Sequence, residues 1–272
     1  MPIRIILHVR PIEEQHIRPF LGEETRKFFL SILPDDLVEE IRGIKFAPYA
    51  IKPLHPLRPI KLVYNNMWVV SPSDRLALEF DVIDPKIEEL LHKKIVEYLH
   101  ELITIELGGG SFLLEKIISK AVPFKALLVE YAPQTFTIKF QTPTMIGRKR
   151  HPIEEPYFRL FPNPRDICEN LLKLWNKYSD IDPKINTEKF LDWVTRKVYV
   201  RHYKLRTREV TIEGKTIAGF KGVAGYIVRN THKNFAHFLI SLIRLGEISN
   251  IGVKRTYGCG VISLSICRCC DK

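Results

Sequence analysis

The chain has 272 residues, of which 45% are hydrophobic, so it is long enough for two domains that each bury a core. Its formal net charge of +11 and pI of about 9.4 favour a polyanionic partner, either nucleic acid or an acidic membrane face. No stretch is apolar for the length of a membrane-spanning helix, and Arg4 interrupts a start too short for a signal peptide. These features predict a cytoplasmic protein.

The first half of the chain has the pattern strand, helix, strand, strand, helix, strand. Strands are expected over residues 4–10, 46–54, 76–82 and 112–118, where aliphatic residues alternate or cluster. A first helix is expected over residues 23–33. A second follows Asp84-Pro85, an N-cap with proline at the first helical position, and carries apolar residues at helical spacing from Ile87 to Leu102.

The second half repeats this order. Strands are expected over residues 135–141 and 260–266 and on both sides of a hairpin tip at Glu213-Gly214. Helices are expected over residues 164–178, 187–197 and 233–245, the last one ending at Gly246. The order βαββαβ, present twice, predicts an α+β protein with two tandem ferredoxin-like (RRM-like) domains, residues 1–122 and 123–272, with a connector between Pro123 and Pro133.

A glycine-rich loop precedes the last strand. Gly252, Gly258 and Gly260 allow positive φ and a close backbone approach, and between them lie Lys254 and Arg255. Successive N–H groups of such a loop can face an anion, to which the two cations add charge and a bidentate fork. This chemistry suits a phosphate backbone.

A basic strand lies upstream of the loop. Since alternate side chains of a strand share a face, one face is predicted to carry His202, Lys204, Arg206 and Arg208. Four basic side chains in a row repel one another unless an anion covers them. The alternative is a solvated outer face without a ligand.

Glycines recur on the following strand, over residues 219–225. Glycine inside a strand marks a bulge or a close backbone approach. Two interpretations stay open: tight packing of a helix on the sheet, or an RNA contact made by Lys221.

Other site classes find little support in the sequence. Of the five cysteines, three crowd the end of the chain as Cys267, Cys269 and Cys270, whereas a zinc site needs four ligands, usually in two pairs, so no metal and no cofactor are predicted. None of the nine histidines has Ser or Thr two residues later, which argues against a two-histidine phosphoesterase. No phosphate-binding P-loop or paired-carboxylate motif is evident.

The C-terminal motifs resemble those of the CRISPR-associated repeat-processing endoribonucleases, the Cas-six family of the RAMP superfamily. The resemblance rests on Gly219-Phe-Lys-Gly222, the amphipathic helix after it and the glycine loop, whose family pattern is G-h-G-x5-G-h-G. Asn250 replaces the first glycine, a mild departure because Asn tolerates left-handed backbone. Phe140-Gln-Thr-Pro-Thr144 and Phe161-Pro-Asn-Pro-Arg165 also resemble the family.

This resemblance implies an activity. Such enzymes bind the repeat of a CRISPR precursor transcript and cut once, without a metal, by attack of the adjacent 2′-hydroxyl. The products are a 2′,3′-cyclic phosphate and a 5′-hydroxyl. The resemblance also makes Gly252, Gly258, Gly260, Lys254, Arg255, Lys221 and the four basic strand residues candidates for binding RNA.

The catalytic residues are the point of departure from the family. Many members use a histidine near the end of the first helical region, where this chain has Arg42. The chain is therefore predicted to be a histidine-poor variant whose catalytic candidates are Lys27, Arg42, Lys45 and Lys52, with Tyr49 close by. The alternatives are an inactive repeat-RNA-binding subunit of an effector complex and a general basic RNA-binding protein. A homodimer is left open.

Overall fold

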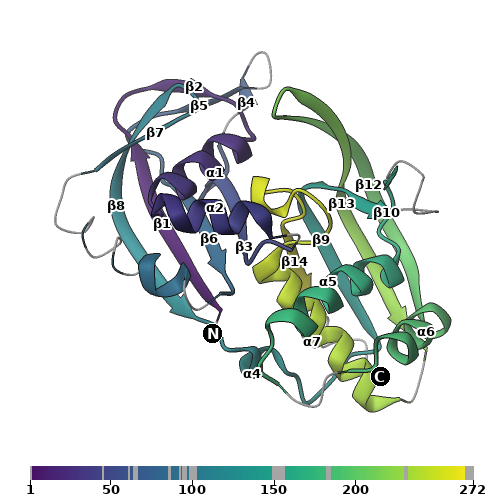
Figure 1. Cartoon of the computed structure of the whole chain (residues 1–272). Helices are drawn as coiled ribbons and strands as arrows, with labels where there is room; N and C mark the ends of the chain where they lie inside the picture. Colours follow the sequence, from purple (N-terminus) through teal and green to yellow (C-terminus); the bar gives the residue numbers. More distant parts are fainter. Residues whose placement is uncertain are drawn as a thin grey trace. The chain divides into compact units, whose positions relative to one another are not determined.

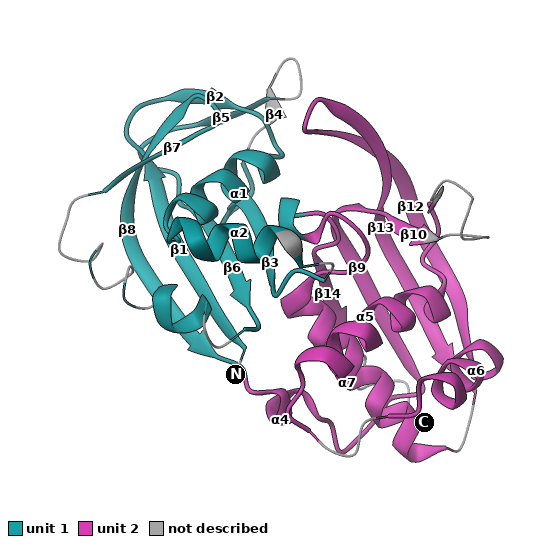
Figure 2. Cartoon of the chain, in the orientation of Figure 1, with its two compact units in different colours: residues 1–122, 256–258 teal, residues 123–255, 259–272 magenta. Residues whose placement is uncertain are grey.

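The computed structural model describes residues 2–44, 46–60, 62–63, 67–84, 87–91, 93, 97, 103–148, 157–181, 185–229 and 232–266 (Figure 1). The chain divides into two compact units (Figure 2). Unit 1 comprises residues 1–122 together with 256–258, and unit 2 comprises residues 123–255 together with 259–272.

Unit 1 is built on an antiparallel five-stranded sheet in the order β3-β6-β1-β8-β7. Its strands are β1 (Ile3–Pro11), β3 (Tyr49–Pro56), β6 (Leu76–Val82), β7 (Thr104–Leu107) and β8 (Gly110–Ala121). The first and third strands of the βαββαβ order, β1 and β6, are central, as a split βαβ arrangement requires. Helices α1 (Gly22–Ser31) and α2 (Asp35–Gly43) follow β1 in the chain.

The predicted second helix of this half is seen in part, since residues 87–91 are helical with Ile87 and Leu91 buried. Most of its remaining length lies outside the described residues. A small three-stranded sheet in the order β2-β5-β4 was not predicted; it is formed by β2 (Gln15–Ile17), β5 (Met67–Val70) and β4 (Leu62–Val63).

The core of unit 1 lies on one face of its sheet. Alternate residues of β1 are buried, beginning with Ile3 and Ile5, and the residues between them point to the other face. Phe29 of α1 packs against Tyr49 of β3 and Phe80 of β6, with ring centroids 4.7 Å and 5.0 Å apart. This aromatic contact fixes α1 on the sheet.

Unit 2 has an antiparallel four-stranded sheet in the order β12-β13-β9-β14. Its strands are β9 (Thr135–Thr144), β12 (Val198–Ile212), β13 (Lys215–Val228) and β14 (Ile262–Ser265). Its helices are α4 (Phe124–Leu127), α5 (Pro164–Tyr178), α6 (Thr187–Lys197) and α7 (Lys233–Ser249). Two short strands, β10 (Ile146–Arg148) and β11 (Tyr157–Arg159), form a separate hairpin.

The sheet of unit 2 is also ferredoxin-like, because its first and third strands, β9 and β13, are central. The predicted fold class of two tandem ferredoxin-like units is therefore confirmed. The predicted hairpin tip is confirmed as well: Glu213 and Gly214 have φ values of +51° and +73°, as a tight two-residue turn demands.

One predicted boundary is wrong. Helix α7 does not end at Gly246 but continues to Ser249. A Cβ at Gly246 would lie 3.1 Å from the Ile262 side chain and 3.2 Å from that of Ile251. This glycine therefore serves close packing of the helix, and the helix ends at Asn250, whose φ is +56°.

The helices of unit 2 cover one face of its sheet. Trp175 of α5 packs edge-on against Phe238 of α7, with centroids 5.2 Å apart, and Phe140 packs against Phe220 at 4.9 Å. Tyr226 is buried, and its hydroxyl donates to the carbonyl of Pro162. The opposite face carries the exposed side chains of β12 and is described below. None of the helices in the described part of the chain has the length and apolar character to cross a bilayer.

Candidate nucleic-acid interface

The glycines of the loop after α7 lie where the backbone has positive φ and passes too close to other backbone atoms for a side chain. Gly252 and Gly260 have φ values of +88° and +75°. A Cβ at Gly260 would stand 1.8 Å from the carbonyl oxygen of Ile251, and one at Gly252 would stand 2.2 Å from that of Met145. Asn250 has positive φ, as its place in the family pattern predicted.

The N–H groups of the loop are directed differently from the prediction. Five donate to protein acceptors and so do not face an anion: Ile251 to Gly260, Gly252 to Asn170, Val253 to Met145, Cys259 to Lys254 and Gly260 to Pro143. The expectation of an N–H nest is wrong for these groups. The glycines set the backbone conformation of the loop, and nearby oxygen atoms of the protein accept hydrogen bonds from the N–H groups that this conformation exposes.

The two cations of the loop have different environments. Lys254, at φ +57°, places its Nζ 3.2 Å from Oε2 of Glu213 at the hairpin tip. Arg255 is only 7% exposed, and its Nη1 donates to the carbonyl of Ser249 over 2.6 Å. The geometry gives Arg255 a part in holding the loop closed, while its contact with RNA stays a prediction.

Residues 256–258 belong to unit 1, where they pack on α1 and β3. The guanidinium of Arg26 lies 4.6 Å from the ring centroid of Tyr257. Burial raises the pKa of Tyr49, against the opposing effect of the nearby Arg26 and Thr256. The phenol is thus neutral and buried, which suits a supporting role better than proton transfer to a substrate.

The basic strand β12 has the predicted alternation. His202, Lys204, Arg206 and Arg208 pair with Gly225, Val223, Lys221 and Gly219 of β13. These β13 positions alternate with the buried Phe220 and Ala224, so the four basic residues lie on the face that the helices leave open. On the neighbouring strand β13, Gly222 has a φ of +140°, and the pairing with β9 shifts register between Phe220 and Gly222, an irregularity of the kind that glycines in a strand indicate.

Two further lysines lie on the same open face. Lys221 is directly opposite Arg206, and Lys139 of β9 is opposite Val223. We call the whole set the basic band: Lys139, His202, Lys204, Arg206, Arg208 and Lys221. Burial, and then the charges of Arg206, Arg208 and Lys139, lower the pKa of Lys221. No member of the band forms an ion pair with another described residue.

The four catalytic candidates are placed separately in unit 1. Lys27 of α1 is 71% exposed, with Nζ 2.9 Å from Oε1 of Glu23, a contact that raises the pKa of Lys27. Arg42 of α2 is 57% exposed and pairs with Glu39, also at 2.9 Å. Lys45 lies outside the described residues.

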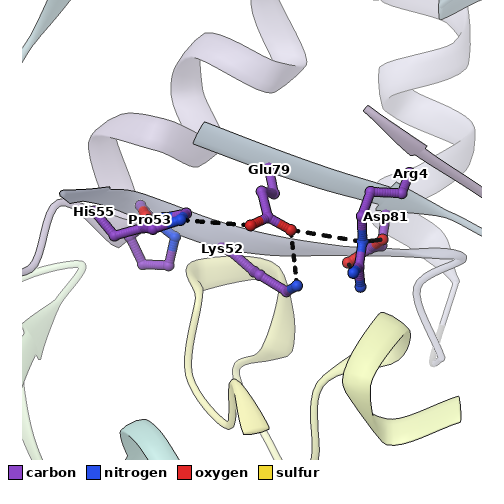
Figure 3. Close-up of polar contacts among 6 residues, drawn as sticks. All are labelled: Arg4, Lys52, Pro53, His55, Glu79 and Asp81. Carbon is purple, nitrogen blue, oxygen red and sulfur yellow. Dashed lines mark hydrogen bonds and ion pairs between the residues drawn. The ribbon is translucent and has the colours of Figure 1, made fainter. Parts of the chain in front are cut away.

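Lys52 of β3 is held in a polar cluster on the sheet (Figure 3). Its Nζ lies 2.7 Å from Oε2 of Glu79 on β6, and the two side chains are 13% and 14% exposed. His55 places Nε2 3.4 Å from the other oxygen of Glu79, and its Nδ1 lies 3.0 Å from the Pro53 carbonyl. Lys52 and His55 are three residues apart, so in a regular strand they would point to opposite faces. A bulge between them brings both to Glu79.

Charge pairing sets the protonation of this cluster. Glu79 is nearly buried, which would raise its pKa, but His55, Lys52 and Arg4 together lower the pKa of Glu79 to about 2. Asp81 is fully buried, and burial raises its pKa to about 6 against the pull of Arg4, whose guanidinium binds both carboxylate oxygens at 2.7 Å and 3.1 Å. Glu79 therefore stays ionised and holds Lys52 as a cation. Glu79 and His55 were not predicted as site residues.

The described residues contain no group of three His, Cys, Asp or Glu side chains that could bind a metal ion. The three cysteines near the end of the chain lie outside the described part. Cys168 and Cys259 are buried free thiols, and burial raises the pKa of Cys259 to about 12. Such thiols are unreactive.

Two ferredoxin-like units, a closed glycine loop and a basic band with no carboxylate partner among the described residues are features expected of the class of proteins that bind nucleic acid. Comparison with known proteins shows what the chain is similar to. Residues 138–262 match the family model described as CRISPR-associated endoribonuclease Cas6. This segment includes most of β9, the β12–β13 hairpin and the glycine loop.

Whole-chain similarities agree with this match. A protein of Streptococcus thermophilus named CRISPR-associated endoribonuclease Cas6 is 25% identical over 239 residues, which cover 87% of this chain and 88% of that protein. The product complex of Thermus thermophilus Cas6 (TTHB231) superposes with a TM-score of 0.76 at 18% identity, covering 97% of this chain and all of that one. The Cas6 (TTHA0078) substrate mimic complex has a TM-score of 0.69 at 18% identity over 97% and 99% of the two chains. The family model over residues 138–262 and the similar protein of Streptococcus thermophilus confirm the resemblance to the Cas6 endoribonucleases found in the sequence.

Proposed function

We propose that this protein is an endoribonuclease that binds the repeat of CRISPR precursor RNA and cleaves the transcript into guide RNAs. The observation that carries the proposal is the position of the family match. Residues 138–262 span both the basic band and the glycine loop, the two features whose chemistry suits RNA. The similar structures include a product complex and a substrate mimic complex of Cas6 proteins, and their fold supports the same conclusion for this chain.

The proposed reaction is a transesterification. The 2′-oxygen forms a bond to the adjacent phosphorus while the bond from phosphorus to the 5′-oxygen breaks, which leaves a 2′,3′-cyclic phosphate and a 5′-hydroxyl. The 2′-hydroxyl gives up a proton and the leaving 5′-oxygen gains one. Cations stabilise the charge that develops on the phosphate oxygens, and alignment of the reacting atoms supplies much of the remaining rate.

Lys27, Arg42, Lys45 and Lys52 are the proposed sources of that positive charge. Lys52 is the best held of the three described candidates, because it is nearly buried and the ionised Glu79 fixes it as a cation. Lys27 and Arg42 are exposed, and each has a single carboxylate partner on its own helix. Replacing Lys27 or Arg42 by Ala is expected to lower the cleavage rate more than RNA affinity. Unchanged rates after replacement of all four residues would overturn the assignment.

Cleavage is tested with end-labelled repeat RNA in EDTA, beside a matched RNA with a 2′-deoxy group at the cut site. Cutting of the first RNA alone supports the proposed 2′-hydroxyl mechanism without a metal. Cutting of both would refute that mechanism, and cutting that requires added Mg²⁺ would refute its metal independence.

The role of the loop is tested with Lys254→Ala. Lys254 is the accessible cation, whereas replacing the buried Arg255 would disturb the loop itself. The variant should bind repeat RNA more weakly and with a shallower dependence on salt, because a phosphate contact is lost. Lys173→Ala, a helix lysine paired with Glu169, is the matched control. Equal affinity and equal salt slope for Lys254→Ala and the wild type would exclude the loop from the RNA site.

One observation favours a second candidate, a repeat-RNA-binding subunit without activity. Arg42 stands where many family members have a histidine, and it is exposed and paired with Glu39. Tight binding without cleavage in the assay above would select this candidate. Association with a CRISPR effector complex and a cytoplasmic location belong to the proposal as expectations, and a homodimer is left open.

A further inference from the structure

Exposed apolar side chains gather at one edge of the unit 2 sheet. Phe158 of β11 and Leu160 and Phe161 of the segment after it are exposed, and so is Tyr203 of β12. We call these four residues the apolar rim. Single exposed apolar residues are common on protein surfaces, whereas a group of them marks an interaction site.

The rim is held in place by the fold of unit 2. On β12, Tyr203 pairs with the buried Ala224, so it lies on the covered face of the sheet, opposite to the basic band. Tyr203 is nevertheless 61% exposed, so the helices leave this part of the edge strand uncovered. Phe161 precedes Pro162, whose carbonyl accepts the hydrogen bond of the buried Tyr226. This anchor holds Phe161 beside Tyr203.

The rings of Phe161 and Tyr203 meet edge to face. Their centroids are 5.4 Å apart, and their planes are inclined by 88°. In such a contact Phe161 occupies at most one face of the Tyr203 ring, so the other face is open to a planar ligand. Because Phe161 already restricts the Tyr203 side chain, a group that stacks on this ring loses little free energy to the ordering of the side chain.

The charge around the rim suits a polyanion. Residues 157–165 and 198–208, which supply the rim and its neighbours in the chain, contain no Asp or Glu and carry six Lys or Arg. The first acid after them on α5 is Asp166, which is buried with its carboxylate 2.6 Å from Arg159. Exposed rings among cations are typical of surfaces that bind single-stranded nucleic acid, where bases stack on the rings and cations contact the phosphates.

We infer that the apolar rim is a second RNA site, at which a base of an unpaired segment stacks on Tyr203. Since β12 is the edge strand of its sheet, an RNA strand that leaves the basic band reaches Tyr203 by passing around that edge. A paired segment does not bind in this way, because its bases are stacked inside the double helix. The inference rests on the proposed function in that the ligand is RNA, and it adds a site for unpaired nucleotides on the other face of β12.

The test uses the full chain with Tyr203→Ala and three RNAs that carry equal numbers of phosphates: an unpaired oligonucleotide, the same oligonucleotide with abasic sites, and a blunt duplex. Fluorescence anisotropy at several salt concentrations gives the affinities. The variant should bind the unpaired RNA about 10-fold more weakly, because a stacked base is lost, and with the same salt slope, because no cation is removed. The abasic RNA and the duplex should change by less than about twofold.

Three further variants separate stacking from other effects. Tyr203→Phe keeps the ring and should bind like the wild type, whereas Tyr203→Leu is apolar without a ring and should lose as much affinity as Tyr203→Ala. Tyr131→Ala, which removes another exposed tyrosine of unit 2, should leave all affinities unchanged. Because Tyr203 is largely exposed, its variants should melt at the temperature of the wild type. A 2-aminopurine in the unpaired RNA should be quenched by the wild type and not by Tyr203→Ala.

Three outcomes overturn the inference. Equal affinity of Tyr203→Ala and the wild type for unpaired RNA would leave the rim as a docking surface for a protein. An equal loss for the abasic RNA, or wild-type affinity of Tyr203→Leu, would exclude stacking. If the wild type still cleaves repeat RNA in these cases, the proposed function stands and this inference alone fails. A wild type that neither binds nor cleaves repeat RNA refutes both.

Discussion

Replacing Glu79 by Gln tests the idea that this carboxylate holds the polar cluster of unit 1 together. The change keeps the size of the side chain and removes its charge. Lys52 would then remain nearly buried without a counter-charge, and His55 would lose the partner of its Nε2. The variant is therefore expected to be less stable than the wild type at neutral pH.

Two lines of reasoning give a similar magnitude. Removing one partner of a buried ion pair typically costs about 3–5 kcal/mol. The fall of the Glu79 pKa from 4.5 to about 2 corresponds to about 3 kcal/mol, at about 1.4 kcal/mol per pH unit. A loss of that size lowers the melting temperature of a chain of this length by roughly 6–12 °C.

The pH dependence has a definite sign. Because the pKa of Glu79 is lower in the folded than in the unfolded protein, its stabilisation is fully present above about pH 4.5 and is lost as the pH falls toward 2. The stability gap between wild type and Glu79→Gln should therefore be widest at pH 5–7 and narrow between pH 4.5 and 2. Urea unfolding at several pH values measures it directly.

Glu115→Gln is the matched control. Glu115 lies on the same sheet and forms ion pairs with Arg10 at 3.0 Å and Arg75 at 2.7 Å, but these side chains are partly exposed. Its replacement should cost about 0–1 kcal/mol. Equal losses for Glu79→Gln and Glu115→Gln, or a gap that does not change with pH, would refute the reasoning.

Three further predictions concern the glycine loop. Gly260→Ala should lower the free energy of unfolding in urea several times more than Gly214→Ala. Both residues have positive φ, but only the new Cβ at position 260 meets a backbone oxygen, at 1.8 Å. Equal losses for the two variants would contradict this. Asn250→Ala should destabilise by about 1–2 kcal/mol more than Asn250→Gly, since Gly accepts a φ of +56° and Ala does not, and the reverse order in thermal melts would disprove it. Arg255→Lys should lose about 2 kcal/mol or more, because a shorter ammonium does not reproduce the buried guanidinium contact with the Ser249 carbonyl; a melting temperature equal to that of the wild type would count against it.

Elements with local signals were predicted well. Helices α5 and α6 begin where Asn163 and Asn186 accept hydrogen bonds from the first N–H groups, and both run over the predicted residues. The end of α7 was predicted wrongly because a glycine after an amphipathic run is typical of a helix end. In the structure, Gly246 lies inside the helix and makes room for Ile251 and Ile262. Packing between distant segments decided that boundary, and no local pattern reports it.

The candidate site was predictable only in part, for a similar reason. Alternation placed the basic residues of β12 on one face, and the register bears this out. The sequence did not place Lys52 and His55 together, because residues three apart in a regular strand lie on opposite faces. The bulge that brings them to the same face leaves no pattern in the sequence. The glycines of the loop likewise indicated its conformation but not the acceptors that its N–H groups would find.

The pairing of the cations in unit 1 also separates the roles that they can take in a reaction. A substrate phosphate competes with the carboxylate that each cation already contacts. The pairs Lys27–Glu23 and Arg42–Glu39 are exposed and screened by water, so a phosphate would displace either carboxylate at little cost. The nearly buried pair of Lys52 with Glu79 is worth far more to the fold, so Lys52 must act where it stands, with Glu79 still bound. Lys27 and Arg42 of the helices could therefore exchange their carboxylates for a phosphate, whereas Lys52, on the sheet face opposite α1, would keep Glu79 as its partner.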